Sequence, residues 1–373
     1  MSIVSVNDFV VRFANINGSG SASANQMFAR SIIRMGVPVA TRNIFPSNIQ
    51  GLPTWYEVRV SEAGWQGARG GIDLVVAMNP QTFDKDVASI EPGGYLFYDC
   101  SRPIPASKFR ADITVIGVPL TEICNREYTE SRQRQLFKNI ICVGALSALL
   151  SIEPEVVLQL LAEQFAGKDK LIAANHKAFA IGRDWALANL ACPLGITVRR
   201  ADKVGDRIYV EGNAAAALGA VYGGATVCAW YPLTPSTSLA EAFTSYTRKL
   251  RTEADGARRY AIVQAEDEIA SIGVVVGAGW NGARAFTATS GPGISLMQEF
   301  LGLAYFAEIP AVLFNVQRGG PSTGMPTRTQ QSDVLACAYA SHGDTKHVLL
   351  FPRDPGEAFT MGAEAFNLAE RLQ

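Results

Sequence analysis

One passage of the sequence, residues 261–300, constrains the fold more than any other. It opens with a short β-branched run, AIVQA, which is followed by three acidic residues and a segment rich in alanine and glycine that is typical of a helix. A second strand, RAFTATS, then leads into a Gly-Pro-Gly turn, where Ser290 can cap the next helix. The passage therefore predicts two strand-to-helix turns at the carboxyl ends of strands, where open α/β sheets place their ligands. We expect the Glu268 carboxylate and the free amides after Ser290 to lie on this edge of one sheet.

The rest of the chain divides into two α/β parts. Short apolar strands alternate with turns over residues 8–118, and the pattern becomes helical over residues 130–193. After a polar, glycine-bearing stretch, strands again alternate with helices, which predicts a parallel sheet covered on both faces. We therefore expect a first α/β domain, a linker and a second domain, over residues 1–194, 195–208 and 209–373.

The end of the second domain carries two further expectations. HVLLF, residues 347–351, is expected to form a strand, and residues 354–373 a helix. That helix reads as a crossover to another strand, yet none follows it. Either the sheet lacks one strand or the chain has been cut at Gln373.

The composition narrows the class of protein. The chain has 33 Lys and Arg against 34 Asp and Glu, so its near-neutral charge favours neither nucleic acid nor an anionic membrane as a partner. The six cysteines form no C-x-x-C pair and there are only three histidines, which disfavours a metal or iron–sulfur site built by this chain alone. Polar residues interrupt the apolar N-terminus, and no apolar run approaches the roughly 20 residues of a membrane span. We expect a soluble, cytoplasmic protein.

The turn after the first strand has two interpretations. Gly18 and Gly20 stand among small residues at the start of an amphipathic helix, which resembles a dinucleotide-binding fingerprint. The position of the third glycine is taken by Ser23. A tight strand-to-helix turn without a ligand explains the two glycines equally well, because glycine serves both purposes.

Four groups are expected on the carboxyl edge of the second sheet: Thr234, Glu268, the Thr287–Gly293 turn and Arg318. Each has a plain explanation by itself. Acids at helix starts complement the helix dipole, and Thr234 between two prolines can simply cap a helix. Arg318 at a strand end is unremarkable unless it faces a carboxylate. The gathering of all four on one edge favours a ligand site.

These residues resemble the α subunit of the 2-oxoacid:ferredoxin oxidoreductases, most closely the 2-oxoglutarate enzymes. The resemblance covers essentially the whole chain, since residues 8–193 are similar to the family's γ component, fused in front of α. The motifs that carry it are Gly212-Asn213, Tyr231–Ser236, Ala265–Ser271, Thr287–Gly293, Gln317–Gly324 and His342–Asp344, with Phe45-Pro46-Ser47 and Gln50-Gly51 in the γ-like part.

The resemblance implies thiamine diphosphate chemistry, with coenzyme A as acyl acceptor and ferredoxin as electron carrier. It implies that this chain gives the domain that faces the cofactor's aminopyrimidine, while its γ-like domain covers the active site and helps to bind coenzyme A. A separate β subunit would hold the diphosphate, its Mg²⁺ and a [4Fe–4S] cluster, in an α2β2 assembly that is active only with both chains.

The resemblance also implies roles for single residues. Glu268 occupies the position of the carboxylate that lies against the pyrimidine ring nitrogen and so promotes proton transfer at the thiazolium. Arg318 matches the arginine that pairs with the substrate's 1-carboxylate, and Thr234 the threonine that bonds near its keto group. Ser290 and Gly291 would contact the cofactor. No residue is assigned to a metal.

Two other functions are compatible with the sequence. One is a non-catalytic protein of the same fold that holds coenzyme A or a partner subunit. The other is a ferredoxin-independent thiamine diphosphate enzyme subunit, such as a transketolase-like protein or a decarboxylase. The family's α chain normally continues with the last strand of this sheet and another domain, whereas this sequence stops at Gln373. Neither the particular 2-oxoacid nor the direction of the reaction follows from the residues.

Overall fold

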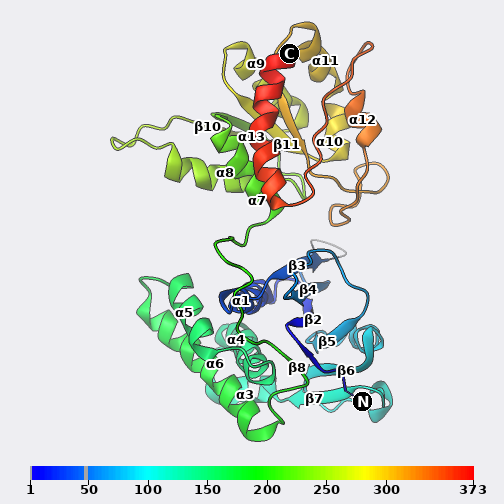
Figure 1. The fold of residues 1–373 in the computed structure, drawn as a ribbon, viewed down its shortest axis with the longest axis vertical. Coiled ribbons are helices and arrows are strands. Elements are labelled where there is room, and N and C mark those ends of the chain that lie inside the picture. Colours follow the sequence, from blue (N-terminus) through cyan, green and yellow to red (C-terminus); the bar gives the residue numbers. More distant parts are fainter. Residues whose placement is uncertain (1, 46–48) are drawn as a thin grey trace. The chain divides into compact units, whose positions relative to one another are not determined.

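The computed structural model of the protein describes residues 2–45 and 49–373, which form two compact α/β units (Figure 1). The first unit comprises Met1–Tyr209 and the second Val210–Gln373. Within the early-loop motif of the γ-like part, Pro46 and Ser47 lie outside the described residues.

The first unit is built on a six-stranded mixed sheet with the order β3-β4-β2-β5-β6-β7. The strands β2, β5, β6 and β7 are parallel to one another, while β4 is antiparallel to both β2 and β3. The six strands are β2 (Asp8–Ile16), β3 (Val39–Ile44), β4 (Pro53–Ser61), β5 (Ile72–Ala77), β6 (Ile90–Asp99) and β7 (Thr114–Val118). The predicted strands of this part are confirmed to within a few residues.

Two apolar layers cover the two faces of this sheet. Along β2, Phe9, Val11 and Phe13 point to one layer and Val10 to the other, as the period of two residues in a strand requires. The larger layer packs against helices that Figure 1 shows on one side of the sheet: α1 (Ser21–Arg34), α3 (Leu120–Glu127), α4 (Ser131–Leu149), α5 (Pro154–Gln164) and α6 (Asp169–Asn189). The smaller layer packs against α2 (Phe83–Ala88) and the loop that contains η1 (Ala106–Lys108).

The helices α4 and α6 approach each other closely at two glycines. A Cβ atom on Gly144 would overlap the carbonyl of Phe179, and one on Gly182 would overlap the carbonyl of Ile141. Larger residues would therefore push the two backbones apart, which explains the glycine at each position.

The beginning of the segment expected as a linker packs against the first unit. β8 (Ile196–Thr197) pairs in parallel with β1 (Ser5–Val6), and Ile196 and Val198 are buried. The buried Asn7 side chain donates to the carbonyl of Arg199 and accepts from its amide, both at 2.8 Å. The exposed part of the connection therefore begins only after Val198.

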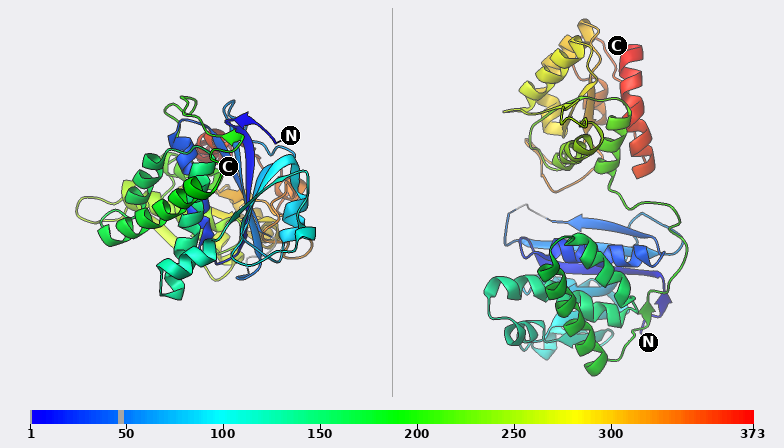
Figure 2. Two further views of the ribbon diagram at one scale, coloured as in Figure 1. Left: turned by 90° about the horizontal axis from the view of Figure 1, so that it is seen from below. Right: turned by 90° about the vertical axis from the view of Figure 1, so that its left-hand side faces the viewer.

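The second unit contains a four-stranded, fully parallel sheet with the order β10-β9-β11-β12. Its strands are β9 (Val227–Trp230), β10 (Ala261–Gln264), β11 (Ala285–Thr289) and β12 (Val312–Asn315). One face packs against α7 (Gly212–Tyr222), α8 (Thr237–Leu250) and α13 (Pro355–Leu372), and the other against α9 (Glu268–Trp280) and α11 (Gln298–Phe306). The short helix α10 (Gly291–Leu296) contacts α9 and α11. Figure 2 shows this arrangement, with the red α13 on one side of the sheet and the yellow helices on the other. The predicted parallel sheet with two covered faces is confirmed.

The prediction of a strand at residues 347–351 is wrong. The segment has no regular secondary structure and no ladder partner among the described residues, and Val348 and Phe351 are 56% and 51% exposed. A β-branched apolar run forms a strand only where a neighbouring strand pairs with its backbone, and this condition cannot be read from the run itself. The helix predicted for residues 354–373 is confirmed as α13, in which Asp354 accepts the amide of Glu357 at 2.9 Å.

Within the described residues, no helix is both long enough and apolar enough to cross a bilayer.

Candidate active site

The order of the second sheet brings the predicted site residues to one edge. Because β9, β11 and β12 are adjacent and parallel, the segments that follow them start from the same side of the sheet. Thr234 follows β9, the turn at Ser290 follows β11, and Arg318 follows β12. Glu268 begins the helix after β10, which pairs with β9.

Glu268 is the first residue of α9 and is only 7% exposed. The neighbouring Asp267 is the N-cap, and its carboxylate accepts the amide of Ala270 at 2.7 Å. The helix start is therefore already satisfied by Asp267. This arrangement leaves the Glu268 carboxylate without a capping task.

The Glu268 side chain packs against the turn after β11. A Cβ atom on Gly293 would stand 3.0 Å from the Cγ of Glu268 and would overlap the Oγ1 of Thr289. Glycine at position 293 thus lets a carboxylate and a buried hydroxyl approach the same point of the turn.

Arg318 and Thr234 are joined directly, although they are 84 residues apart. The Nη1 of Arg318 donates to the carbonyl of Thr234 at 2.6 Å, and the guanidinium is almost entirely buried at 5% exposure. Its Nη2 donates to the carbonyl of Thr323. Burial lowers the pKa of Arg318, and the negative charge of Glu268 acts in the opposite direction. Glu268 and Arg318 therefore share one electrostatic environment.

Several buried polar atoms on this edge have no hydrogen-bond partner among the described residues. They are Trp230 Nε1, Thr289 Oγ1, Ser290 Oγ, Asn315 Oδ1 and Arg318 Nε, while Thr287 Oγ1 is unpaired in the middle of β11. Unpaired buried polar atoms are rare, since each lacks both water and a protein partner. Their concentration at one end of three adjacent strands indicates a place for a polar ligand or for ordered water.

The turn at Ser290 and Gly291, which was predicted to contact a cofactor, begins a helix as expected and lies next to Asp333. Ser290 is the N-cap of α10, but its hydroxyl makes no capping bond. A Cβ atom on Gly291 would overlap the carboxylate of Asp333, which also accepts from the Ser332 hydroxyl at 3.0 Å. The carboxylate of Asp333 therefore lies against Gly291.

Sequence reasoning missed Trp230, Asn315 and Asp333. Trp230 and Asn315 end apolar strands, where an aromatic or a single amide is an ordinary residue. Asp333 comes more than 40 residues after Gly291, and only the course of the intervening chain brings the two together. In the described part of the chain, no group of three or more His, Cys, Asp or Glu side chains is placed to hold a metal ion.

The glycine turn of the first unit is explained by its own conformation and packing. Gly18 and Gly20 have φ angles of 83° and 76°, which favour glycine. A Cβ atom on Gly18 would stand 2.7 Å from the Gln50 side chain, and one on Gly20 would stand 3.1 Å from Leu136. No ligand is needed to account for either glycine.

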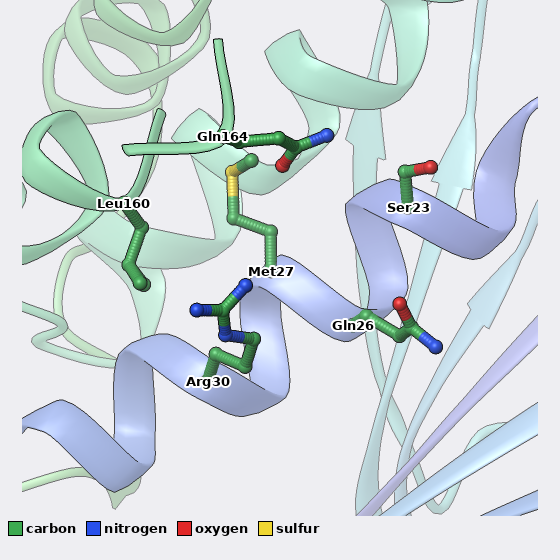
Figure 3. A pocket seen from close by; sticks show the side chains of 6 residues that line it. All are labelled: Ser23, Gln26, Met27, Arg30, Leu160 and Gln164. Carbon is green, nitrogen blue, oxygen red and sulfur yellow. The ribbon is translucent and has the colours of Figure 1, made fainter. Parts of the chain in front are cut away.

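A pocket in the first unit has a different character from this edge. It lies between α1 and α5 and has a volume of about 250 Å³ (Figure 3). Its lining consists of Ser23, Gln26, Met27, Arg30, Leu160 and Gln164. Without a carboxylate, histidine or cysteine in this lining, the pocket offers no side chain for acid–base chemistry at neutral pH.

Two family models together match most of the chain. The model described as "Pyruvate ferredoxin/flavodoxin oxidoreductase" matches residues 10–185. The model described as "Pyruvate flavodoxin/ferredoxin oxidoreductase, thiamine diP-bdg" matches residues 218–373. The second match contains the whole candidate site.

Known proteins similar to the chain are named as subunits of enzymes that act on 2-oxoacids. The α subunit of 2-oxoacid:ferredoxin oxidoreductase 1 from Aeropyrum pernix is 32% identical over 411 residues, which cover 98% of this chain and 63% of that subunit. The 2-oxoglutarate synthase subunit KorA from Methanocaldococcus jannaschii is 45% identical over 165 residues, which cover 44% of this chain and 43% of the relative.

A solved structure is similar over nearly the whole chain. It is the 2-oxoglutarate:ferredoxin oxidoreductase from Magnetococcus marinus, with 2-oxoglutarate, coenzyme A and succinyl-CoA bound. The TM-score is 0.85 at 32% identity, and the match covers 97% of this chain and 61% of that chain. The present chain thus spans less than two thirds of the length of these relatives.

Proposed function

This chain belongs to the family of 2-oxoacid:ferredoxin oxidoreductases, in which it matches the α subunit, and we propose from this membership what it does. It takes part in the thiamine diphosphate-dependent interconversion of 2-oxoglutarate and coenzyme A with succinyl-CoA and CO2. Ferredoxin carries the electrons. The substrate is supported by the names of similar proteins, among them a 2-oxoglutarate synthase subunit and an oxidoreductase with 2-oxoglutarate bound.

The observation that carries the proposal is the set of unsatisfied polar groups around a buried carboxylate. Glu268 and the hydroxyls of Thr289 and Ser290 present one acid and two unpaired donors at the same turn. This donor set suits the nitrogen-rich edge of an aminopyrimidine. In the proposal, Glu268 holds a proton at the pyrimidine ring nitrogen, and Ser290 and Gly291 contact the cofactor. When bound, thiamine diphosphate supplies the electron sink for decarboxylation.

Arg318 and Thr234 are proposed to bind the 2-oxoacid. The Arg318 guanidinium is buried and its Nε–H has no partner among the described residues, so a carboxylate that replaced the main-chain atoms beside this edge would satisfy it. Thr234 holds that guanidinium through its carbonyl. The side chain of Thr234 is proposed to bond near the keto group.

The remaining parts of the proposal rest on the family. Residues 1–194, with the start of the expected linker packed against them, form the γ-type domain and help to bind coenzyme A. Residues 209–373 form the pyrimidine-type domain. A β subunit holds the diphosphate, Mg²⁺ and a [4Fe–4S] cluster, and completes a cytoplasmic α2β2 enzyme. The chain is active only with this subunit.

The experiment that tests the proposal is an assay of the protein purified from its own cells with every chain that accompanies it. Reduction of ferredoxin should require 2-oxoglutarate, coenzyme A and thiamine diphosphate together, and the sample should show an iron–sulfur spectrum. Turnover that persists in Glu268→Ala and Arg318→Ala would favour a non-catalytic role for this chain. Decarboxylation without an iron–sulfur spectrum would favour a ferredoxin-independent enzyme.

A further inference from the structure

The guanidinium of Arg318 is occupied on one edge by main-chain atoms of a nearby loop. Its Nη2 donates to the carbonyl of Thr323, while its Nε has no partner among the described residues. Gly324 covers that Nε, since a Cβ atom on Gly324 would stand only 3.1 Å from it. The edge formed by Nε and Nη2 thus faces Thr323 and Gly324.

The loop that brings these two residues to Arg318 comprises residues 319–329 and is held by its own backbone. Arg318 and Thr329 form an antiparallel bridge, and the amide of Gly319 donates to the carbonyl of Arg328 at 2.9 Å. The amide of Met325 donates to the carbonyl of Gly319 at 2.8 Å. Gly324 has a φ of 76°, a conformation that glycine adopts readily and alanine does not. The amides of Gly324 and Arg328 also donate to the carbonyls of Pro321 and Met325, both at 2.9 Å, so the loop is held mainly by bonds within itself.

A carboxylate binds a guanidinium best through two parallel hydrogen bonds, which need two adjacent N–H groups. The Nε–Nη2 edge provides such a pair, because Nη1 is engaged by Thr234 on the other side. We propose that Thr323 and Gly324 are positioning residues that hold Arg318 until the substrate's carboxylate replaces the Thr323 carbonyl and releases the loop 319–329. The inference rests on the proposed role of Arg318 as the carboxylate ligand.

The replacement is favourable because a carboxylate is an ionised acceptor that can take two parallel bonds from the guanidinium, whereas the Thr323 carbonyl is neutral and takes one. The bond from Nη1 to Thr234 keeps the guanidinium in place during the exchange. It follows that loop closure competes with the substrate, so a change that weakens the closed loop should strengthen binding.

Hydrogen–deuterium exchange of the purified enzyme with its partner chains tests the release directly. Saturating 2-oxoglutarate, with binding measured separately by calorimetry, should make the amides of residues 319–329 exchange faster, although ligands usually slow exchange at their sites. Unchanged or slower exchange in this loop at saturation would overturn the inference.

A substitution at Gly324 tests whether closure of the loop 319–329 competes with the binding of 2-oxoglutarate. Gly324→Ala strains the closed loop at a positive φ and brings a Cβ against Arg318, so the KM for 2-oxoglutarate should fall on the order of fivefold to tenfold with kcat unchanged. The matched control is Gly256→Ala, whose φ is 84° and whose Cβ would meet nothing described within 4 Å; it should leave KM unchanged.

An unchanged or higher KM in Gly324→Ala would contradict the inference, because a loop that merely supports the site gives that result. Arg318→Gln distinguishes a failure of the proposed role of Arg318 from a failure of the loop inference alone. If Arg318→Gln binds 2-oxoglutarate as well as the wild type, the proposed role of Arg318 fails. If only Arg318→Gln loses binding and Gly324→Ala does not tighten it, the proposed function stands and the loop inference fails. Should Gly324→Ala not fold, the exchange experiment decides.

Discussion

Gly293 lies directly against Glu268, with the position of a Cβ on the glycine only 3.0 Å from the Cγ of the acid. The same Cβ would overlap the hydroxyl of Thr289. The turn after β11 therefore tolerates no side chain at this point if the carboxylate is to keep its place. Glycine at position 293 is therefore needed for the proposed role of Glu268.

Gly293→Ala should therefore impair catalysis more than stability. We expect kcat to fall at least tenfold, which corresponds to about 1.4 kcal/mol of lost transition-state stabilisation, because the Glu268 carboxylate is displaced. Steady-state kinetics of the purified complex measures this. The control is Gly277→Ala on the same helix as Glu268, where a Cβ would meet nothing described within 4 Å. A Gly277→Ala variant as impaired as Gly293→Ala would show that crowding at Glu268 is not the cause.

Arg318→Gln should act on binding rather than on the chemical step. A charge-assisted hydrogen bond contributes roughly 1.5–3 kcal/mol, so its loss should raise the KM for the 2-oxoacid about ten- to a hundredfold. The kcat should change much less, since the pair between Arg318 and the 1-carboxylate is strongest before this group leaves as CO2 and so stabilises the bound substrate more than the transition state. Equal losses in kcat and kcat/KM, with KM unchanged, would contradict this division of roles.

Removal of an unpaired buried hydroxyl should stabilise the folded chain when no ligand is bound. Thr287→Val removes a buried hydroxyl that has no described partner, so the free energy of unfolding without ligands should rise by up to about 1 kcal/mol. Thr247→Val is the matched control, because its buried hydroxyl donates to the carbonyl of Phe243 at 2.8 Å. That variant should lose about 1 kcal/mol. Urea denaturation compares the two, and a destabilised Thr287→Val would indicate that its hydroxyl is satisfied.

The first unit contains an acid whose ionisation should affect stability. Burial by itself would raise the pKa of Asp99, but the Lys138 ammonium at 2.6 Å and the hydroxyls of Ser101 and Thr121 lower it to about 2. Since the pKa is lower in the folded protein than in the unfolded chain, the stabilisation is complete above about pH 4. It disappears as the pH falls through about 2.

Asp99→Asn should therefore reduce the free energy of unfolding by about 2 kcal/mol at pH 7, and by progressively less below pH 4. Urea denaturation over this range measures the difference between the variant and the wild type. A difference that stays constant from pH 7 to pH 3 would show that the cause is lost packing rather than lost charge.

The parts of the fold that follow from local pattern could be predicted from the sequence. The helix after Asp354 combines apolar periodicity with a capping residue, so its bounds follow from short-range rules. The segment 347–351 could not be predicted in this way, because a strand also needs a partner that lies elsewhere in the chain.

The candidate site divides in the same manner. Glu268 and Arg318 stand at strand ends and could be placed on one edge by topology alone. The neighbours Trp230, Asn315 and Asp333 could not, since an unpaired buried atom or a contact with Gly291 appears only when the whole unit is packed. The hydrogen bond from Arg318 to the Thr234 carbonyl likewise depends on the path of two loops.

Glu268 is proposed to promote proton transfer at the bound cofactor. The most direct measurement is the rate at which the C2 proton of thiamine diphosphate exchanges with deuterium in the purified complex, followed by quenched-flow NMR. We expect Glu268→Gln to slow this exchange by roughly 10²–10⁴-fold while the cofactor remains bound. An exchange rate equal to that of the wild type, at full cofactor occupancy, would contradict it.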